Sequence, residues 1–321
     1  MSKTSLARRT GALAAAVGCA LLVTSCGSAT PSAGSSGSDG STDATVAGVH
    51  VKVDQSLHDA LPSGIKSSGV VRVASDVPYA PFEMYASAGS TQITGIDYDL
   101  GQALGAKLGV KFTFSPVKFE GIIAAVDAGQ YDVAMSDMGD RRTREEKLDF
   151  VDYTQDGTGI LVAKGNPSHI TTFTDLCGKA VSTEAGTNTE KFVTDYGQRQ
   201  CTAAGKPPIN LQTYPKDTDG QLAIKADKVV AHVLDAAAAG YAAATADQGA
   251  SFEVVKDPAA PNGYNSTPNG IAVAKSEPQL ADAIQKALQQ LIDDGTYGRI
   301  LAKYGESSIA VAKAGRNAAV S

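Results

Sequence analysis

The sequence predicts an α/β protein built from two successive units, each with helices packed on the faces of a parallel sheet. Two observations lead to this fold class. Short apolar strands alternate with helices along most of the 321 residues, and such alternation is typical of parallel strands joined by helical crossovers. The alternation restarts near residue 159, which indicates a second unit of the same kind.

The first unit opens with an apolar strand at residues 70–74, followed by a helix at residues 97–108. Leu100 and Leu104 recur at helical spacing in that segment, and Gly109 is a typical helix terminator. The unit continues in order with a strand at residues 111–117, a short helix at 120–128 and an apolar strand at 131–135.

The second unit repeats this pattern from residue 159 onward. Its strands are expected at residues 159–163, 179–183, 209–214 and 229–234, and its helices at 188–203, 217–226 and from Asp235 onward. A strand at residues 270–274 and an amphipathic helix at 277–293 follow, and residues 296–304 close the folded body. The composition after Gly305 predicts a polar tail.

The first 25 residues have the features of an export signal. Lys3, Arg8 and Arg9 precede an apolar stretch that is too short and too rich in Ala and Gly to span a bilayer. The stretch leads into Val-Thr-Ser-Cys26, which resembles the bacterial lipobox, where the cysteine becomes the lipidated first residue after cleavage. We therefore expect a signal peptide at residues 1–25 and lipidation of Cys26. The alternative is a plain signal peptide with an incidental cysteine.

Residues 27–48 are dominated by Gly, Ser, Ala and Thr. Such a segment cannot bury enough apolar surface to offset the entropy lost on ordering. We therefore expect residues 26–59 to be the lipidated cysteine and a flexible tether, whose polar part spans about 25 Å as a random coil. Cys177 and Cys201 are the cysteines left beyond the signal and the lipid site, and a leftover pair in an exported protein predicts a disulfide.

The composition argues against several classes of function. The formal net charge is −6, which disfavours nucleic acid as a partner, and no segment after the signal is apolar enough to cross a bilayer. The histidines are scattered without ligand spacing, and the sequence lacks the nucleotide-binding, nucleophile-elbow and zinc-protease motifs. We therefore expect no metal, no cofactor and no catalytic residues.

The segment from Ala74 to Glu83 reads Ala-Ser-Asp-Val-Pro-Tyr-Ala-Pro-Phe-Glu. It resembles the polar amino-acid binding proteins of ABC transporters, the extracellular solute-binding proteins of family 3, whose first strand is followed by an Asp, an aromatic residue and Pro-Phe-Glu. Further segments resemble the family in the same order: Gly95–Leu100, Phe119–Val126, Tyr131–Val133, Arg144, Asp149–Phe150, Leu176–Lys179, Ala185–Thr187, Gly295–Tyr297 and Lys303–Gly305. Each segment alone is a weak signal, and their order over about residues 60–306 makes the resemblance specific.

The resemblance implies a two-lobe fold like that of type II periplasmic binding proteins, with the ligand held in a cleft between the lobes. Lobe 1 would comprise residues 60–154 and 269–306, lobe 2 would comprise residues 159–264, and residues 307–321 would be the tail. Two strands would cross between the lobes, near residues 155–158 and 265–269.

The implied function is that of a lipid-anchored, extracytoplasmic receptor of an ABC importer. Acting as a monomer, it would capture a polar amino acid by lobe closure and deliver it to the permease subunits. Two alternatives stay open: an enzyme on the same fold that resembles cyclohexadienyl dehydratase, and a lipoprotein that senses its ligand for a signalling partner.

The resemblance also assigns ligand-binding residues. Arg144 would bind the ligand's carboxylate as a planar bidentate donor, unless it forms a surface ion pair. Asp235 would pair with the ammonium group, and as a residue before a helix it is also a candidate N-cap. Tyr79 and Phe119 would sandwich the ligand's side chain, with ordinary core packing as the alternative. Asp76 would face the cleft, unless it caps a turn.

Five further residues complete the expected site. Ser136 would contact the ammonium or the carboxylate, and Thr187 and Asn188 would offer backbone N–H groups at the start of a helix. Asp137 and Gly139 stand where the family usually has small and hydroxyl residues, and Glu184 stands where a polar or basic residue would touch the ligand's side chain. If Asp137 and Glu184 face the cleft together with Asp76, the site is more acidic than one ammonium group requires. We therefore hypothesise a cationic ligand such as arginine or lysine.

Overall fold

The computed structural model describes residues 44–319. The expected signal peptide and the lipid site at Cys26 lie outside the described residues. The strands are β1 Ala44–Val46, β2 Val49–Val51, β3 Val70–Ser75, β4 Met84–Tyr85, β5 Ile93–Thr94, β6 Lys111–Pro116, β7 Val133–Ala134, β8 Leu148–Ala163, β9 Ala180–Glu184, β10 Asn210–Tyr214, β11 Ala231–Asp235, β12 Phe252–Val254 and β13 Tyr264–Ala274. The helices are α1 Gln55–Ala60, α2 Ser63–Ser68, α3 Ile96–Leu108, α4 Phe119–Asp127, α5 Arg142–Glu145, α6 Asn188–Phe192, α7 Gln198–Ala203, α8 Asp217–Lys225, α9 Ala236–Thr245, α10 Pro278–Asp293 and α11 Thr296–Lys303.

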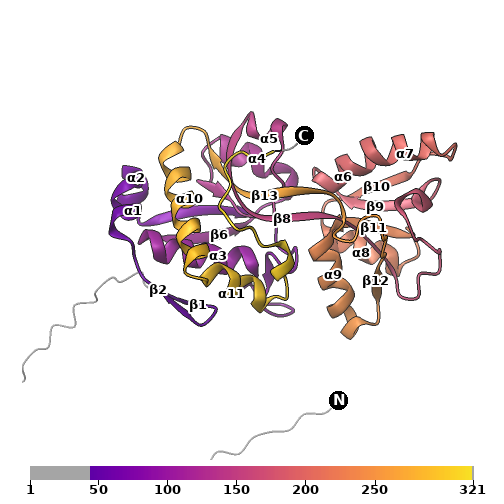
Figure 1. Ribbon diagram of the computed structural model, residues 1–321, viewed down its shortest axis with the longest axis horizontal. Coiled ribbons are helices and arrows are strands. Elements are labelled where there is room, and N and C mark those ends of the chain that lie inside the picture. Colours follow the sequence, from indigo (N-terminus) through magenta and orange to yellow (C-terminus); the bar gives the residue numbers. More distant parts are fainter. Residues whose placement is uncertain (1–43, 320–321) are drawn as a thin grey trace, which may run out of the picture. The chain divides into compact units, whose positions relative to one another are not determined.

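A nine-stranded sheet follows the order β10-β9-β11-β8-β13-β7-β3-β6, with β12 also paired to β8. β3 is parallel to β6 and β7, and β9 is parallel to β10 and β11. These two parallel groups are the two units that the alternation of strands and helices predicts. β8 and β13 are antiparallel to each other and run between the two groups (Figure 1).

We call residues 44–154 and 269–319 lobe 1, and residues 159–264 lobe 2. The pairing of β13 with β8 is irregular between Tyr264 and Thr267 and again between Asn269 and Gly270. Irregular pairing locally disrupts a ladder and bends the strand. The interruptions therefore fall where the two strands pass from one lobe to the other.

Each lobe buries apolar side chains against its part of the sheet. In lobe 1, Leu104 of α3 and Leu288 of α10 lie in one buried cluster, and Ile122 of α4 packs with Phe150 of β8 in another. Lobe 2 has a further cluster that includes Phe192 at the end of α6. The helices expected from apolar spacing bury the stripes that this spacing defines.

Most of the expected elements are present with boundaries shifted by a few residues. The strand expected at residues 131–135 is only two residues long as β7, and the strand expected at 159–163 is the end of the 16-residue β8. The helix expected at 188–203 is divided into α6 and α7 by a π-helical turn at Val193–Gly197.

The expectation of a tether reaching residue 59 is wrong for residues 44–59. β1 and β2 form an antiparallel hairpin, and Val46 and Val51 on it are buried. Asp54 caps α1 by accepting hydrogen bonds from the backbone N–H groups of Ser56 and Leu57. The segment is folded because its apolar residues, Val46, Val51 and Leu57, join the core cluster of lobe 1.

The expectation of a polar tail after Gly305 is wrong for residues 306–319. Ile309 and Ala314 are buried, and Ala310 forms an isolated bridge with Thr154 of β8. Arg316 forms an ion pair with Asp149, with 3.0 Å between Nη2 and Oδ2. The segment thus covers β8, although its composition alone gives little sign of burial.

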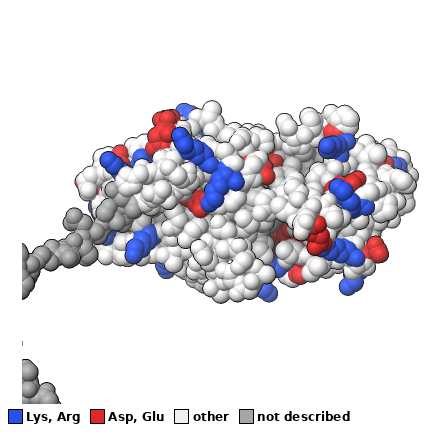
Figure 2. Space-filling model, turned by 90° about the horizontal axis from the view of Figure 1, so that it is seen from below, with Lys and Arg blue, Asp and Glu red and all other residues white. Residues whose placement is uncertain are grey.

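The disulfide between Cys177 and Cys201 is confirmed. It joins the end of the short 3₁₀ turn Phe173–Leu176 to α7, so it ties two connections of lobe 2 together. Within residues 44–319, no helix is long and apolar enough to cross a membrane. Figure 2 shows acidic and basic side chains interspersed on one face of the molecule.

Candidate functional site

Twelve residues from both lobes line one cavity. They are Asp76, Tyr79, Glu83, Phe119, Ser136, Asp137, Gly139, Arg144, Glu184, Thr187, Asn188 and Asp235. All ten residues expected from the sequence are among them, and the two additional ones are Glu83 and Gly139. The volume open to water-sized molecules is about 20 Å³, which is room for about one water. Direct contacts between the lobes therefore fill most of the space.

The cavity lies where the parallel strands end. Asp76 follows β3 and Ser136 follows β7, while Glu184 and Asp235 are the last residues of β9 and β11. The carboxyl ends of parallel strands meet at one edge of a sheet, and in open α/β sheets ligands bind just outside that edge. Two such edges, one from each lobe, supply these side chains to the same cavity.

Arg144 is buried in α5 and reaches across the lobe boundary. Its Nη1 donates to the carbonyl oxygen of Gly139 at 2.8 Å, and its Nη2 donates to the carbonyl oxygen of Gly186 in lobe 2 at 3.0 Å. The guanidinium carbon lies 5.3 Å from the centre of the Phe119 ring. Burial, with a smaller effect from nearby Arg141, lowers the pKa of Arg144 to about 9. The alternative of a surface ion pair does not hold.

Asp235 also joins the two lobes. Its Oδ2 accepts a hydrogen bond of 2.8 Å from the hydroxyl group of Tyr79 in lobe 1. Asp235 precedes α9, but its side chain makes no capping hydrogen bond to that helix. Burial raises the pKa of Asp235 to about 6, although the Tyr79 hydrogen bond acts in the opposite direction. The carboxylate is therefore directed into the cavity and away from the end of α9.

Three more carboxyl groups make the cavity acidic. Burial raises the pKa of Glu83 and of Asp137 well above the usual range, and burial beside Asp76 raises the pKa of Glu184 to about 11. Ser136 donates to Oε1 of Glu83 at 2.6 Å, and Asn269 donates to Oδ1 of Asp137 at 2.6 Å.

The other oxygens of these carboxyl groups have no partner. Within the described chain, Oε2 of Glu83, Oδ2 of Asp137 and Oε1 of Glu184 accept no hydrogen bond. A buried acceptor without a partner costs about 1–3 kcal/mol. The arrangement is suited to a ligand group that carries several N–H donors and a positive charge.

The remaining expected residues are held by local hydrogen bonds. Thr187 donates to the carbonyl oxygen of Glu184 at 2.7 Å and caps α6 by accepting from the N–H of Glu190. Asn188 accepts a hydrogen bond from Nε of Arg141, a further contact between the lobes. A β-carbon at Gly139 would collide with the Asn188 side-chain amide, which would have to shift to make room for it.

Sequence reasoning missed three contributors to the site. Glu83 was within reach of prediction, since it ends the Pro-Phe-Glu segment of the family resemblance. Gly139 contributes a backbone carbonyl oxygen, which no side-chain pattern reveals. Lys216 of lobe 2 contacts Asp76 and also donates to the carbonyl oxygen of Val77 at 3.0 Å. Its only signal was its position, just before a helix that follows the end of a parallel strand.

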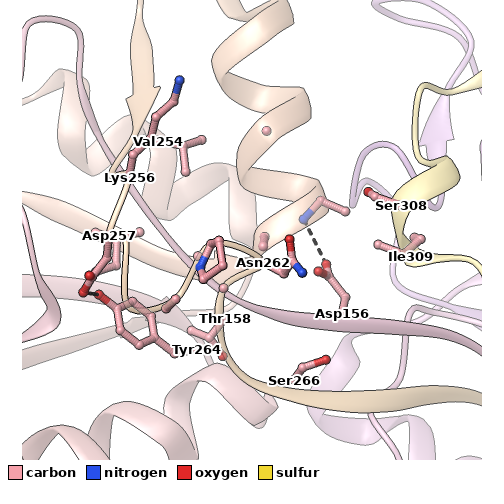
Figure 3. A pocket seen from close by; sticks show the side chains of 18 of the residues that line it. Asp156, Thr158, Val254, Lys256, Asp257, Asn262, Tyr264, Ser266, Ser308 and Ile309 are labelled. Atoms are coloured by element: carbon pink, nitrogen blue, oxygen red, sulfur yellow. Dashed lines mark hydrogen bonds between the residues drawn. The ribbon is translucent and has the colours of Figure 1, made fainter.

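A second, larger cavity of about 740 Å³ lies between β8, α9, residues 254–264 and the C-terminal segment. Figure 3 shows two hydrogen bonds among the residues that line it. Asp156 accepts a hydrogen bond of 2.9 Å from the N–H of Ala237, and Tyr264 donates to Asp257. The first cavity is the stronger candidate site, because it gathers buried carboxyl oxygens without a partner in the described chain at the strand ends of both lobes. Among residues 44–319, no cluster of three or more His, Cys, Asp or Glu side chains is placed to hold a metal ion.

Comparisons of the sequence with known proteins all find bacterial solute-binding proteins. The sequence model of a family described as bacterial extracellular solute-binding proteins, family 3, matches residues 71–307. The arginine-binding protein ArgT of Corynebacterium glutamicum is 30% identical over 245 residues, which cover 76% of this chain and 77% of ArgT. The L-cystine-binding protein TcyJ of Escherichia coli K12 is 28% identical over 267 residues, which cover 81% of this chain and 91% of TcyJ.

Solved structures share the fold. An ancestral arginine-binding protein bound to arginine is 31% identical with a TM-score of 0.64, and the match covers 74% of this chain and 98% of the other. The ancestral amino acid-binding protein AncCDT-1, described as a precursor of cyclohexadienyl dehydratase, is 31% identical with a TM-score of 0.64. That match covers 75% of this chain and 97% of AncCDT-1.

Proposed function

Because the chain belongs to the bacterial extracellular solute-binding proteins of family 3, we propose that it is the amino-acid receptor of an ABC importer and that its ligand is a cationic amino acid. Arg144 of lobe 1 and Asp235 of lobe 2 carry the proposal, since both line the same cavity, Arg144 buried and Asp235 half-buried. The guanidinium group suits the ligand's carboxylate, and the carboxylate suits its ammonium group. A ligand held by both would contact both lobes, and it would therefore favour the closed arrangement.

The acidic half of the cavity supports a cationic ligand. Oxygens of Glu83, Asp137 and Glu184 lack hydrogen-bond partners in the described chain, and an ammonium or guanidinium group offers several donors. Glutamate or aspartate would instead place a second carboxylate among these groups. The similarity to arginine-binding proteins points in the same direction, whereas TcyJ, a relative of comparable identity, binds L-cystine.

The place of action follows from the N-terminal sequence. We propose that residues 1–25 direct export, that Cys26 is lipidated and that the segment before the folded body tethers the protein to the outer face of the cell membrane. Lobe closure on the ligand would then present it to the permease subunits, with one copy of the chain as the acting unit. Neither a metal nor a cofactor takes part in this proposal.

An enzyme on the same fold is the second candidate. The similarity to AncCDT-1 and the raised pKa of Glu184, which would suit a general acid, favour it. AncCDT-1 is itself described as an amino acid-binding protein. Turnover of a cyclohexadienyl substrate by the purified protein would favour the enzyme, and its lack alongside tight amino-acid binding would favour the receptor.

A thermal-shift screen against the common amino acids and cationic metabolites tests the proposal. A ligand that binds only the folded state raises the melting temperature as its concentration rises. We expect a shift with arginine or lysine that Arg144→Ala abolishes. Arg142→Ala is the matched control, because Arg142 lies exposed in the same helix. A shift with neutral or acidic amino acids alone would contradict the cationic assignment but keep the receptor.

A further inference from the structure

Lys216 forms an ion pair between the two lobes at the edge of the ligand cavity. It precedes α8 in lobe 2, and its Nζ contacts Oδ1 of Asp76 in lobe 1. The same Nζ donates to the carbonyl oxygen of Val77 at 3.0 Å. The Asp76 side chain is 3% exposed and that of Lys216 is 28% exposed, so the carboxylate is buried and the lysine covers it from the solvent side.

A buried network fixes the start of α8. Asp217, the next residue, is hydrogen-bonded to Nε2 of His232 in β11 at 2.7 Å. The other ring nitrogen of His232 lies 2.9 Å from the hydroxyl group of Ser182 in β9. These three side chains are buried together. They hold the backbone at Lys216 against the sheet of lobe 2, so that its side chain crosses to lobe 1.

The lysine ammonium lies beside the same carboxyl groups that a cationic ligand needs. Asp76 and Glu184 both line the cavity, and they neighbour each other across the lobe boundary. The charge of Lys216 acts on Glu184 as well as on Asp76. The open volume of about 20 Å³ is too small for an amino acid, so a ligand enters only when the lobes separate. Its distal cation can then bind Asp76 only in competition with Lys216, which pairs with that carboxylate in the closed arrangement.

We propose that Lys216 is a specificity-determining residue that competes with the ligand's distal cation for Asp76 and also holds the lobes together through the same contact. This inference rests on the proposed function, which it extends from ligand class to selectivity. A ligand without a distal cation would leave the Lys216–Asp76 pair in place. A cationic ligand would displace Lys216 and bind Asp76 in its place. Binding of such a ligand would therefore break the Lys216–Asp76 ion pair.

Lys216→Met tests this inference because it removes the charge and keeps a side chain of similar length. We expect arginine, measured by isothermal titration calorimetry, to bind about tenfold more tightly to Lys216→Met, because Asp76 then has no internal partner. Lys225→Met is the matched control: Lys225 lies on the same helix, and its ion pair with Asp247 stays within lobe 2. The control should bind arginine as the unmodified protein does.

Small-angle X-ray scattering without ligand gives an independent readout. We expect Lys216→Met to have a larger radius of gyration than the unmodified protein, since one contact between the lobes is lost, and Lys225→Met to have the same radius. Lys216→Gln repeats both measurements with a polar side chain. Weaker or unchanged arginine binding, or an unchanged radius, would overturn the inference. If no amino acid binds the unmodified protein, the proposed function fails, while the scattering still tests the contact.

Discussion

Asp235 connects binding to lobe closure through a single side chain. It accepts a hydrogen bond from Tyr79 across the boundary and makes no capping hydrogen bond to α9, whose first turn donates instead to the Asp156 side chain. Asp favours the N-cap position because it can bond the first N–H groups of a helix. At Asp235 the carboxylate instead crosses to lobe 1, which is the arrangement expected of a group whose partner is a ligand.

Replacing Asp235 by Asn tests this role. The amide keeps the size of the side chain and removes its negative charge, so the ligand's ammonium group loses a charge-assisted hydrogen bond. We expect the dissociation constant for the amino-acid ligand to rise by about 100-fold, measured by isothermal titration calorimetry. Asp227→Asn, an exposed change in lobe 2, is the control. Equal affinities of the two variants would remove Asp235 from the proposed site.

At the scale of elements, two carboxyl groups lie near each other, one on β8 and one in the loop before α5. Asp140 and Asp152 are both buried, and neither carboxyl group accepts a hydrogen bond within the described residues. Burial, and then the charge of Asp152, raises the pKa of Asp140 to about 8. Burial also raises the pKa of Asp152 to about 6. The segment after Gly305 covers this pair, since Gly315 packs against the Asp152 side chain.

The pair makes stability depend on pH. The folded state holds a proton on Asp140 up to about pH 8, whereas an unfolded Asp releases it near pH 4. The proton on Asp140 therefore stabilises the folded state at low pH, and this stabilisation is lost as the pH rises from about 4 to about 8. We expect the melting temperature of Asp140→Asn to fall less between pH 5 and pH 8 than that of the unmodified protein. Exposed Asp127→Asn should keep the original slope, and a slope unchanged by Asp140→Asn would contradict the assignment.

The two ends of the folded body could not be predicted from composition. Residues 44–59 and 306–319 mix isolated apolar residues with polar and small ones, and their burial depends on partners that are distant in the sequence. Val46 and Ile309 are buried only because lobe 1 offers a surface for them. The helices α3 and α10 could be predicted, because apolar residues at helical spacing specify a buried stripe without knowledge of the partner.

At the scale of the whole molecule, the site residues that lie at strand ends or in segments resembling the family could be predicted from the sequence. Asp76, Ser136, Glu184 and Asp235 lie at or just after strand ends, so parallel pairing alone brings them together within each lobe. The contacts between lobes were not predictable in this way. The reach of Lys216 to Asp76 depends on how far the lobes close, and no local pattern in the sequence encodes that distance.

The molecule divides into two lobes and the boundary between them, where contacts can change. β8 and β13 carry both lobes, and their pairing is interrupted near the crossing. Arg144 and Tyr79 of lobe 1 donate hydrogen bonds to lobe 2 across this boundary. A ligand that replaces these contacts with contacts of its own would convert binding into a change of lobe position.

Calorimetry with arginine and citrulline tests most directly whether the cavity captures a cationic amino acid. The two ligands have nearly the same shape, and only arginine carries the distal positive charge. We predict micromolar or tighter binding of arginine, about −8 kcal/mol or better, and binding of citrulline that is weaker by about 100-fold. Equal affinity for the two ligands, or no binding of either, would contradict the account.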